Sequence, residues 1–296
     1  MTTNEDRSRF YVPVTINGTP KNLLLDTGGQ MTSISQKAAK ELKLPDIFSK
    51  YNSGDLAGDT SDRAVRVATF DLGNLRGENM KFLVAPFPKL PGEAAGILSA
   101  DLFLQYDVDL DFGANRLNYF SQDHCEGRVA YWPERPLAIL PGDFRNGYLI
   151  VDVTLDGKVF QAILDTGAPI TTAGVSEVIS NFHLTPGSPE LPEYTPVIKE
   201  EDLVKPEDKD KPHWKSYSHK FERLSFGDIT VLNPQVDLLP ETIFGGPLSN
   251  HGTIIIGINV LRQLHIYIAY GEKKLYITLA GNGESALVKP ISTAPP

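Results

Sequence analysis

The chain has 296 residues, 41% hydrophobic and 22% charged, which is typical of a globular protein with one large core or two ordinary ones. Its formal net charge of −9 and the lack of a basic cluster argue against nucleic acid and an anionic membrane surface as partners. The single cysteine, Cys125, excludes an intrachain disulfide and a cysteine-based metal site, and no apolar run reaches the ~20 residues of a membrane span.

The sequence opens on Met1 and a polar run over residues 2–9, without a recognisable signal peptide. We therefore expect a periplasmic or secreted protein if a signal has been removed, and a cytoplasmic one otherwise. A lone cysteine fits either compartment.

Strand signals dominate the N-terminal part of the chain. Residues 10–16 and 22–25 are rich in β-formers and are separated by Asn17-Gly18, a dipeptide that tolerates positive φ. This pattern predicts a β-hairpin whose second strand leads directly into Asp26.

Helical signals are few and short. Ser35 is a candidate N-cap for a helix over residues 36–43, which must end before Pro45. Two further short helices are expected near residues 101–106 and 259–264.

A segment near the N-terminus recurs later in the chain. Residues 14–28 read VTINGTPKNLLLDTG, and residues 153–167 read VTLDGKVFQAILDTG, so the two copies align without a gap. Each copy has a Gly-containing turn and then an apolar run that leads into Asp-Thr-Gly, as Asp26-Thr27-Gly28 and Asp165-Thr166-Gly167. Duplication at so long a period predicts two similar lobes rather than a solenoid.

The repeat extends to a second motif. Ile97-Leu98-Ser99 aligns with Ile255-Ile256-Gly257, and Asp101 aligns with Asn259. We therefore predict an N-terminal lobe over residues 9–120, an interlobe connection over 121–146 and a C-terminal lobe over 147–280. A proline-rich, charged insertion at about residues 186–213 is interpreted as a surface loop, with a lid or an exosite over the cleft as the alternative.

Each copy of the repeat places one carboxylate at the end of a buried strand. Two such turns around a pseudo-two-fold axis would bring Asp26 and Asp165 within hydrogen-bond range, where like charges cannot both ionise easily. The ionised carboxylate can then act as a general base on water, while the protonated one donates to a carbonyl oxygen. Neither step needs a metal or an organic cofactor.

On these motifs the chain resembles the retropepsin-like aspartic proteases, in the bacterial single-chain form with both halves in one polypeptide. Besides the two Asp-Thr-Gly turns and the later apolar-apolar-Gly, the match includes hydroxyl residues shortly after each turn, namely Thr32, Ser33, Ser35, Thr171 and Thr172. The resemblance implies an all-β, bilobed, pepsin-like fold with pseudo-two-fold symmetry and few short helices. It further implies an aspartic endopeptidase that cleaves a peptide or protein substrate as a monomer, without metal or cofactor.

The resemblance also assigns residues by position. It makes Asp26 and Asp165 the catalytic pair, Thr27 and Thr166 the link between the two turns, and Gly28 and Gly167 the glycines beside the substrate backbone. It implies a flap over the cleft at residues 53–60, with Gly54 and Gly58 as hinges. An ordinary glycine-containing hairpin is the alternative for this segment.

The sequence departs from the family at two places. Ser99 stands where the family usually has glycine, and its Cβ is expected to crowd the loop that supports Asp26. Gly29 and Ala168 stand where pepsins often have a hydroxyl residue that would favour the ionised carboxylate. Their lack of a hydroxyl predicts a mildly acidic to near-neutral pH optimum.

Two other functions compete with the endopeptidase. A peptide- or protein-binding module with weak or no turnover is supported by Ser99 and by the charged insertion, but the presence of both aspartates argues against it. A metal-dependent hydrolase would need a histidine or further acidic ligand near either turn, and the sequence has none there.

Overall fold

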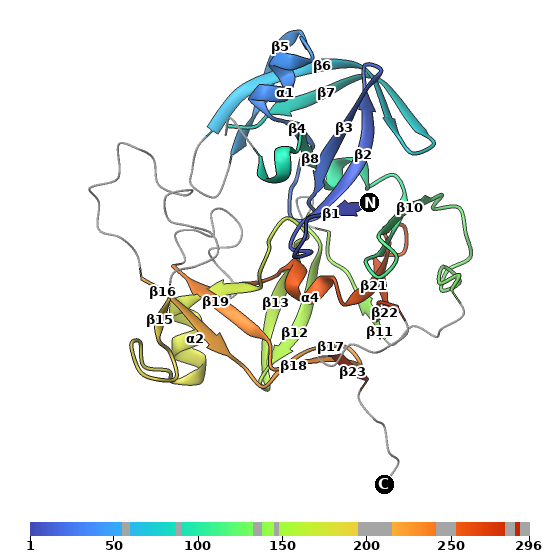
Figure 1. Ribbon diagram of the computed structural model, residues 1–296. Coiled ribbons are helices and arrows are strands. Elements are labelled where there is room, and N and C mark those ends of the chain that lie inside the picture. The colour runs from blue at the N-terminus through green and yellow to red at the C-terminus, as the bar shows by residue number, and fades with distance from the viewer. Residues whose placement is uncertain are drawn as a thin grey trace.

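The computed structural model describes residues 1–54, 60–86, 90–132, 138–144, 148–194, 215–240, 253–281 and 288–290. Within these residues the protein is built from three β-sheets and a few short helices, which confirms the predicted all-β fold class. Figure 1 shows the N-terminal lobe in blue and cyan at the top, the C-terminal lobe below it, and a third sheet on the right. None of the helices in the described part combines the length and the apolar character that crossing a membrane requires.

The N-terminal lobe is an eight-stranded sheet in the order β1-β2-β3-β8-β4-β7-β6-β5, and an additional pairing of β2 with β6 curls it toward a barrel. Its strands are β1 (Thr2–Thr3), β2 (Phe10–Ile16), β3 (Thr19–Leu25), β4 (Ser33–Ile34), β5 (Asp46–Gly54), β6 (Thr60–Leu72), β7 (Leu75–Val84) and β8 (Gly96–Leu98). Its helices are α1 (Gln36–Glu41) and the 3₁₀ turns η1 (Pro91–Glu93) and η2 (Ala100–Leu102).

The C-terminal lobe is a ten-stranded sheet in the order β15-β16-β19-β14-β20-β13-β12-β17-β18-β23. Its strands are β12 (Ile150–Leu155), β13 (Lys158–Leu164), β14 (Thr172–Gly174), β15 (Glu193–Tyr194), β16 (Ser216–Lys220), β17 (Arg223–Phe226), β18 (Ile229–Leu232), β19 (Gln235–Leu239), β20 (Thr253–Ile256) and β23 (Val288–Pro290). Its helices are α2 (Val175–Phe182) and α4 (Ile258–Leu261).

The third sheet joins the two halves of the chain, in the order β10-β9-β21-β22-β11. Its strands are β9 (Asp107–Asp111), β10 (Arg116–Phe120), β11 (Ala138–Pro141), β21 (Leu264–Ala269) and β22 (Lys274–Leu279). Because β9 pairs with β21, and β11 of the predicted connection pairs with β22, main-chain hydrogen bonds hold the lobes in one orientation. The exact lobe boundaries stay a prediction.

The two lobes repeat one strand arrangement. In the first, β3 runs parallel to β8, and β4 pairs antiparallel with β8 and parallel with β7. In the second, β13, β20, β14 and β19 take the same four places with the same directions. The predicted hairpin turns are present as well, with positive φ at both residues of Asn17-Gly18 and of Asp156-Gly157.

The predicted helices are present but shorter than expected. Ser35 caps α1 by accepting a hydrogen bond from the Ala38 N–H, as expected, yet the helix ends at Glu41 because Lys43 adopts a left-handed conformation. The helix expected near residues 259–264 begins and ends earlier, since Leu264 already starts β21. Of the predicted insertion, residues 186–194 are described and end in the short strand β15, while the rest lies outside the described residues.

Candidate active site

Each of the two aspartates follows an interior strand of its sheet, and the last three residues of that strand are buried. Asp26 comes directly after β3, and its N–H donates to the Leu98 carbonyl of the neighbouring strand at 3.0 Å. Asp165 comes after β13, and its N–H donates to the Ile256 carbonyl at 3.0 Å. The parallel pairs β3–β8 and β13–β20 therefore fix the two turns in the same way.

The threonines of the two turns contact each other across the lobe interface. The Thr27 hydroxyl donates to the Leu164 carbonyl at 2.6 Å and accepts from the Thr166 N–H at 3.1 Å. Reciprocally, the Thr166 hydroxyl donates to the Leu25 carbonyl at 2.9 Å and accepts from the Thr27 N–H at 3.0 Å. Because both threonines are buried, these four hydrogen bonds join the turns without competition from water.

The glycines of the two turns allow the aspartates to approach each other. The Gly28 N–H donates to Asp26 Oδ1 at 2.9 Å, and the Gly167 N–H donates to Asp165 Oδ1 at 2.7 Å. A Cβ on Gly28 would lie 2.3 Å from Cγ of Asp165, and one on Gly167 would lie 2.6 Å from Cγ of Asp26. Each glycine thus packs against the carboxylate of the opposite lobe, so the two carboxylates face each other.

The environment of this pair favours one shared proton. Burial, together with the charge of Asp165, raises the pKa of Asp26 well above its usual range. Burial also raises the pKa of Asp165, although hydrogen bonds from Asp26 and from the Gly167 and Ala168 N–H groups, and the charge of Arg9, oppose the rise. The pKa values of both carboxyls are therefore raised, which favours a pair that holds one proton between them.

A second layer of polar groups supports each turn from behind. Asp101 Oδ1 accepts from both the N–H and the hydroxyl of Thr32, at 2.8 and 2.7 Å. In the other lobe, Asn259 Oδ1 accepts from the N–H and the hydroxyl of Thr171, at 2.9 and 3.0 Å. Sequence reasoning gave Asp101 no role, although its alignment with Asn259 was the signal that could have revealed one.

The expected crowding at Ser99 does not occur. Ser99 is fully buried in extended backbone geometry, and its N–H donates to the Thr32 hydroxyl at 3.1 Å. The equivalent Gly257 N–H donates to the Thr171 hydroxyl at 3.2 Å, so the two loops have matching geometry despite the extra side chain. Crowding at Ser99 therefore gives no support to the alternative of a binding module without turnover.

Of the predicted flap over residues 53–60, the structure describes the paired ends of β5 and β6, whereas residues 55–59 lie outside the described residues. Gly54 is the last residue of β5, and it pairs with Thr60 of β6. Gly58 lies outside the described residues, so the hinge role of these glycines stays a prediction.

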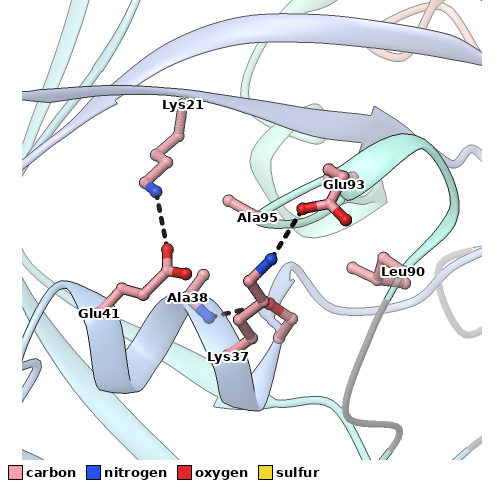
Figure 2. A pocket seen from close by; sticks show the side chains of 9 residues that line it. Lys21, Lys37, Ala38, Glu41, Leu90, Glu93 and Ala95 are labelled. Atoms are coloured by element: carbon pink, nitrogen blue, oxygen red, sulfur yellow. Dashed lines mark hydrogen bonds and ion pairs between the residues drawn. The ribbon is translucent and has the colours of Figure 1, made fainter.

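Other candidate sites do not involve the aspartates. A pocket of about 150 Å³ between α1 and the segment around Glu93 contains two ion pairs, Lys21–Glu41 at 3.1 Å and Lys37–Glu93 at 2.7 Å (Figure 2). Its charges are neutralised in pairs, which leaves little to attract a charged ligand. In the part of the chain that the structure describes, no group of three or more His, Cys, Asp or Glu side chains is arranged to hold a metal ion.

Comparison with known proteins agrees with this geometry. Residues 12–102, from β2 to η2, match the sequence model of the aspartyl protease family. No curated protein matches the chain at a significant level. The matched segment includes the first Asp-Thr-Gly turn and the loop behind it, whereas the second turn is related to it by the internal repeat. Over the matched residues, the predicted resemblance to the retropepsin-like aspartic proteases is therefore confirmed.

Proposed function

We propose that the protein is an aspartic endopeptidase that hydrolyses peptide bonds with a water molecule activated between Asp26 and Asp165. The observation that carries this proposal is the mutual approach of the two carboxylates across the lobe interface, through Gly28 and Gly167. The family match over the first lobe supports peptide-bond hydrolysis in general.

The asymmetry of the pair suggests a role for each carboxylate. We assign Asp165 as the general base, because the positive charge of Arg9 acts more strongly on it than on Asp26 and favours its ionised form. It removes a proton from water, and the oxygen of the water attacks the scissile carbonyl carbon. Asp26 gives its proton to the carbonyl oxygen, which yields a neutral tetrahedral diol. Asp165 then gives its proton to the amide nitrogen, and Asp26 takes a proton from one hydroxyl of the diol as the C–N bond breaks. A carboxylic acid and an amine are released, and the starting protonation of the pair is restored.

The test is the replacement of each aspartate by the isosteric amide, in Asp26→Asn and Asp165→Asn. We expect each variant to lose about 10²–10⁴-fold or more in kcat on a peptide library assayed at several pH values. Asp228→Asn, which changes an exposed aspartate in the β17–β18 turn, is the matched control and should keep full activity. Near wild-type turnover in either dyad variant would contradict the proposal.

A binding measurement complements the kinetic one. A peptide isostere with a central hydroxyl replaces the attacked carbonyl and the attacking water, so it should bind the pair more tightly than a substrate does. We expect it to raise Tm of the wild type and to have little effect on a variant with both aspartates changed to asparagine. An equal rise in both proteins would place the binding site elsewhere.

A further inference from the structure

Ser99 carries a buried hydroxyl for which the described residues provide no hydrogen-bond partner. The residue is fully buried, and its Oγ neither donates nor accepts within hydrogen-bond distance. Leaving a buried hydroxyl unpaired costs free energy, so such a group in a native protein calls for a functional or structural reason.

The position of this hydroxyl relates it directly to Asp26. A Cβ built on Gly29 would lie 2.4 Å from Ser99 Oγ and 2.9 Å from Asp26 Oδ2. The two oxygens therefore border the same small space, which is open because residue 29 has no side chain. The other oxygen of Asp26, Oδ1, already accepts from the Gly28 N–H.

The aligned positions of the second lobe offer no equivalent hydroxyl. Position 257, which aligns with Ser99, is a glycine whose Cβ would lie 2.4 Å from the carbonyl carbon of Ile170. Position 168, which aligns with Gly29, is an alanine. At this pair of aligned positions, a side-chain hydroxyl therefore occurs in the first lobe and not in the second.

We propose that Ser99 is a positioning residue whose hydroxyl donates a hydrogen bond to Oδ2 of Asp26 when this carboxylate gives up its proton. The inference rests on the proposed function, because it assigns a purpose to the hydroxyl only if Asp26 is a proton donor. The bond stabilises the ionised form of Asp26 and orients its outer oxygen, so proton transfer to the carbonyl oxygen becomes easier. The covalent changes of the diol-forming step are the same with or without this hydrogen bond.

The sign of the expected pH effect follows from this role. Without the hydroxyl, ionised Asp26 is less stable, so its pKa rises. The alkaline limb of the pH profile reports loss of the shared proton, and it should therefore move to higher pH, with a smaller movement of the acidic limb. Among the described residues, the other ionisable groups that act on Asp26 are Asp165, Arg9 and Tyr148, and all three stay unchanged in the experiment.

The kinetic test compares kcat/KM against pH for the wild type, Ser99→Ala and Ser216→Ala, on one peptide without titrating groups. Ser216 is the matched control, since it is another buried serine whose hydroxyl has no partner among the described residues. We expect the alkaline limb to rise by about 0.4–1 pH unit in Ser99→Ala, the equivalent of one hydrogen bond, and to stay in place in Ser216→Ala.

A second measurement does not depend on turnover. The aspartate carboxyl carbons are labelled with ¹³C, and the NMR signal that disappears in Asp26→Asn identifies Asp26. Its titration midpoint should rise in Ser99→Ala and remain unchanged in Ser216→Ala. If Ser99→Ala does not fold, Ser99→Gly serves instead, because glycine occupies the equivalent position 257.

The outcomes separate the two proposals. An unmoved midpoint of Asp26 in a folded Ser99 variant overturns the role of Ser99, even if Asp26→Asn abolishes cleavage. Full cleavage by Asp26→Asn overturns the proposed function and, with it, the catalytic purpose of the hydroxyl. A raised midpoint together with a raised alkaline limb supports both.

Discussion

The two lobes present their aspartates on matching backbone turns but surround them with different side chains. In both lobes the aspartate N–H bonds to the neighbouring parallel strand, and the following glycine N–H bonds to Oδ1. The aligned positions at which the side chains differ include Gly29, Ser99 and Asp101 in the first lobe, which correspond to Ala168, Gly257 and Asn259 in the second.

The comparison shows which requirements of the site are symmetric and which are not. Bringing two carboxylates together is a symmetric task, and the reciprocal hydrogen bonds of Thr27 and Thr166 accomplish it with identical residues. Giving the proton to one carboxylate is an asymmetric task, which an identical backbone cannot perform. The differing side chains are therefore the places where the two lobes can divide the roles of acid and base.

The largest expected effect concerns the glycines of the two turns. Gly28→Ala and Gly167→Ala should each lower kcat/KM at least about 100-fold, because the new Cβ would displace the opposite carboxylate. Gly77→Ala is the control, since its Cβ would meet the flexible side chain of Met80, which can move away. Wild-type activity in either turn variant would mean that the carboxylates are farther apart than described.

Replacing Thr27 or Thr166, which link the two lobes, should change the free energy of unfolding more than the chemical step. Thr27→Val or Thr166→Val leaves one buried carbonyl and one buried N–H unpaired, which should lower the free energy of unfolding by roughly 2–4 kcal/mol. Urea denaturation measures this loss. Thr278→Val is the control, because this buried hydroxyl makes only a long contact of 3.5 Å with the next carbonyl. If the two threonine variants lose clearly unequal amounts of unfolding free energy, the two lobes do not contribute equally to this contact.

Asp101, in the loop behind the first turn, is expected to make the stability of the protein depend on pH. Burial raises the pKa of Asp101 above 3.8, its value in the unfolded chain, so ionisation costs stability as the pH rises from 3.8 through the higher folded value. Asp101→Asn removes this loss and should flatten the dependence of the unfolding free energy on pH above about 4. Asn259→Asp should introduce a loss of the same sign. Urea unfolding from acidic to neutral pH checks both, and an unchanged slope in both variants would contradict the assignment.

The smallest expected effect concerns the alanine of the second lobe. Ala168→Ser adds a hydroxyl near ionised Asp165 and should move the acidic limb of kcat/KM downward by about 0.5 pH unit. The wild type should have its optimum in mildly acidic to near-neutral conditions, since the pKa values of both aspartates are raised. Gly29→Ser is not an equivalent change, because its Cβ would collide with Ser99 Oγ. A wild-type optimum in strong acid would contradict the expected pH range. An unmoved acidic limb in an active Ala168→Ser variant would contradict the expected effect of the added hydroxyl.

Much of the local structure and the identity of the pair could be predicted from the sequence. The hairpin at Asn17-Gly18 follows from residues that tolerate positive φ, and the buried end of the strand before Asp26 follows from its apolar run. The duplication indicated a second carboxylate in an equivalent turn. These features depend on contacts between neighbours in the chain, or on comparison of the chain with itself, so the sequence determined them alone.

The tertiary structure alone decided which groups meet. That Gly28 packs against Asp165, that the Ser99 hydroxyl borders Asp26, and that β9 pairs with β21 depend on contacts between segments far apart in the chain. The expectation of crowding at Ser99 was wrong for this reason, since the space for its side chain comes from the missing Cβ of Gly29, 70 residues earlier. Steric preference at one residue is local, whereas the free volume around a side chain is set by everything packed against it.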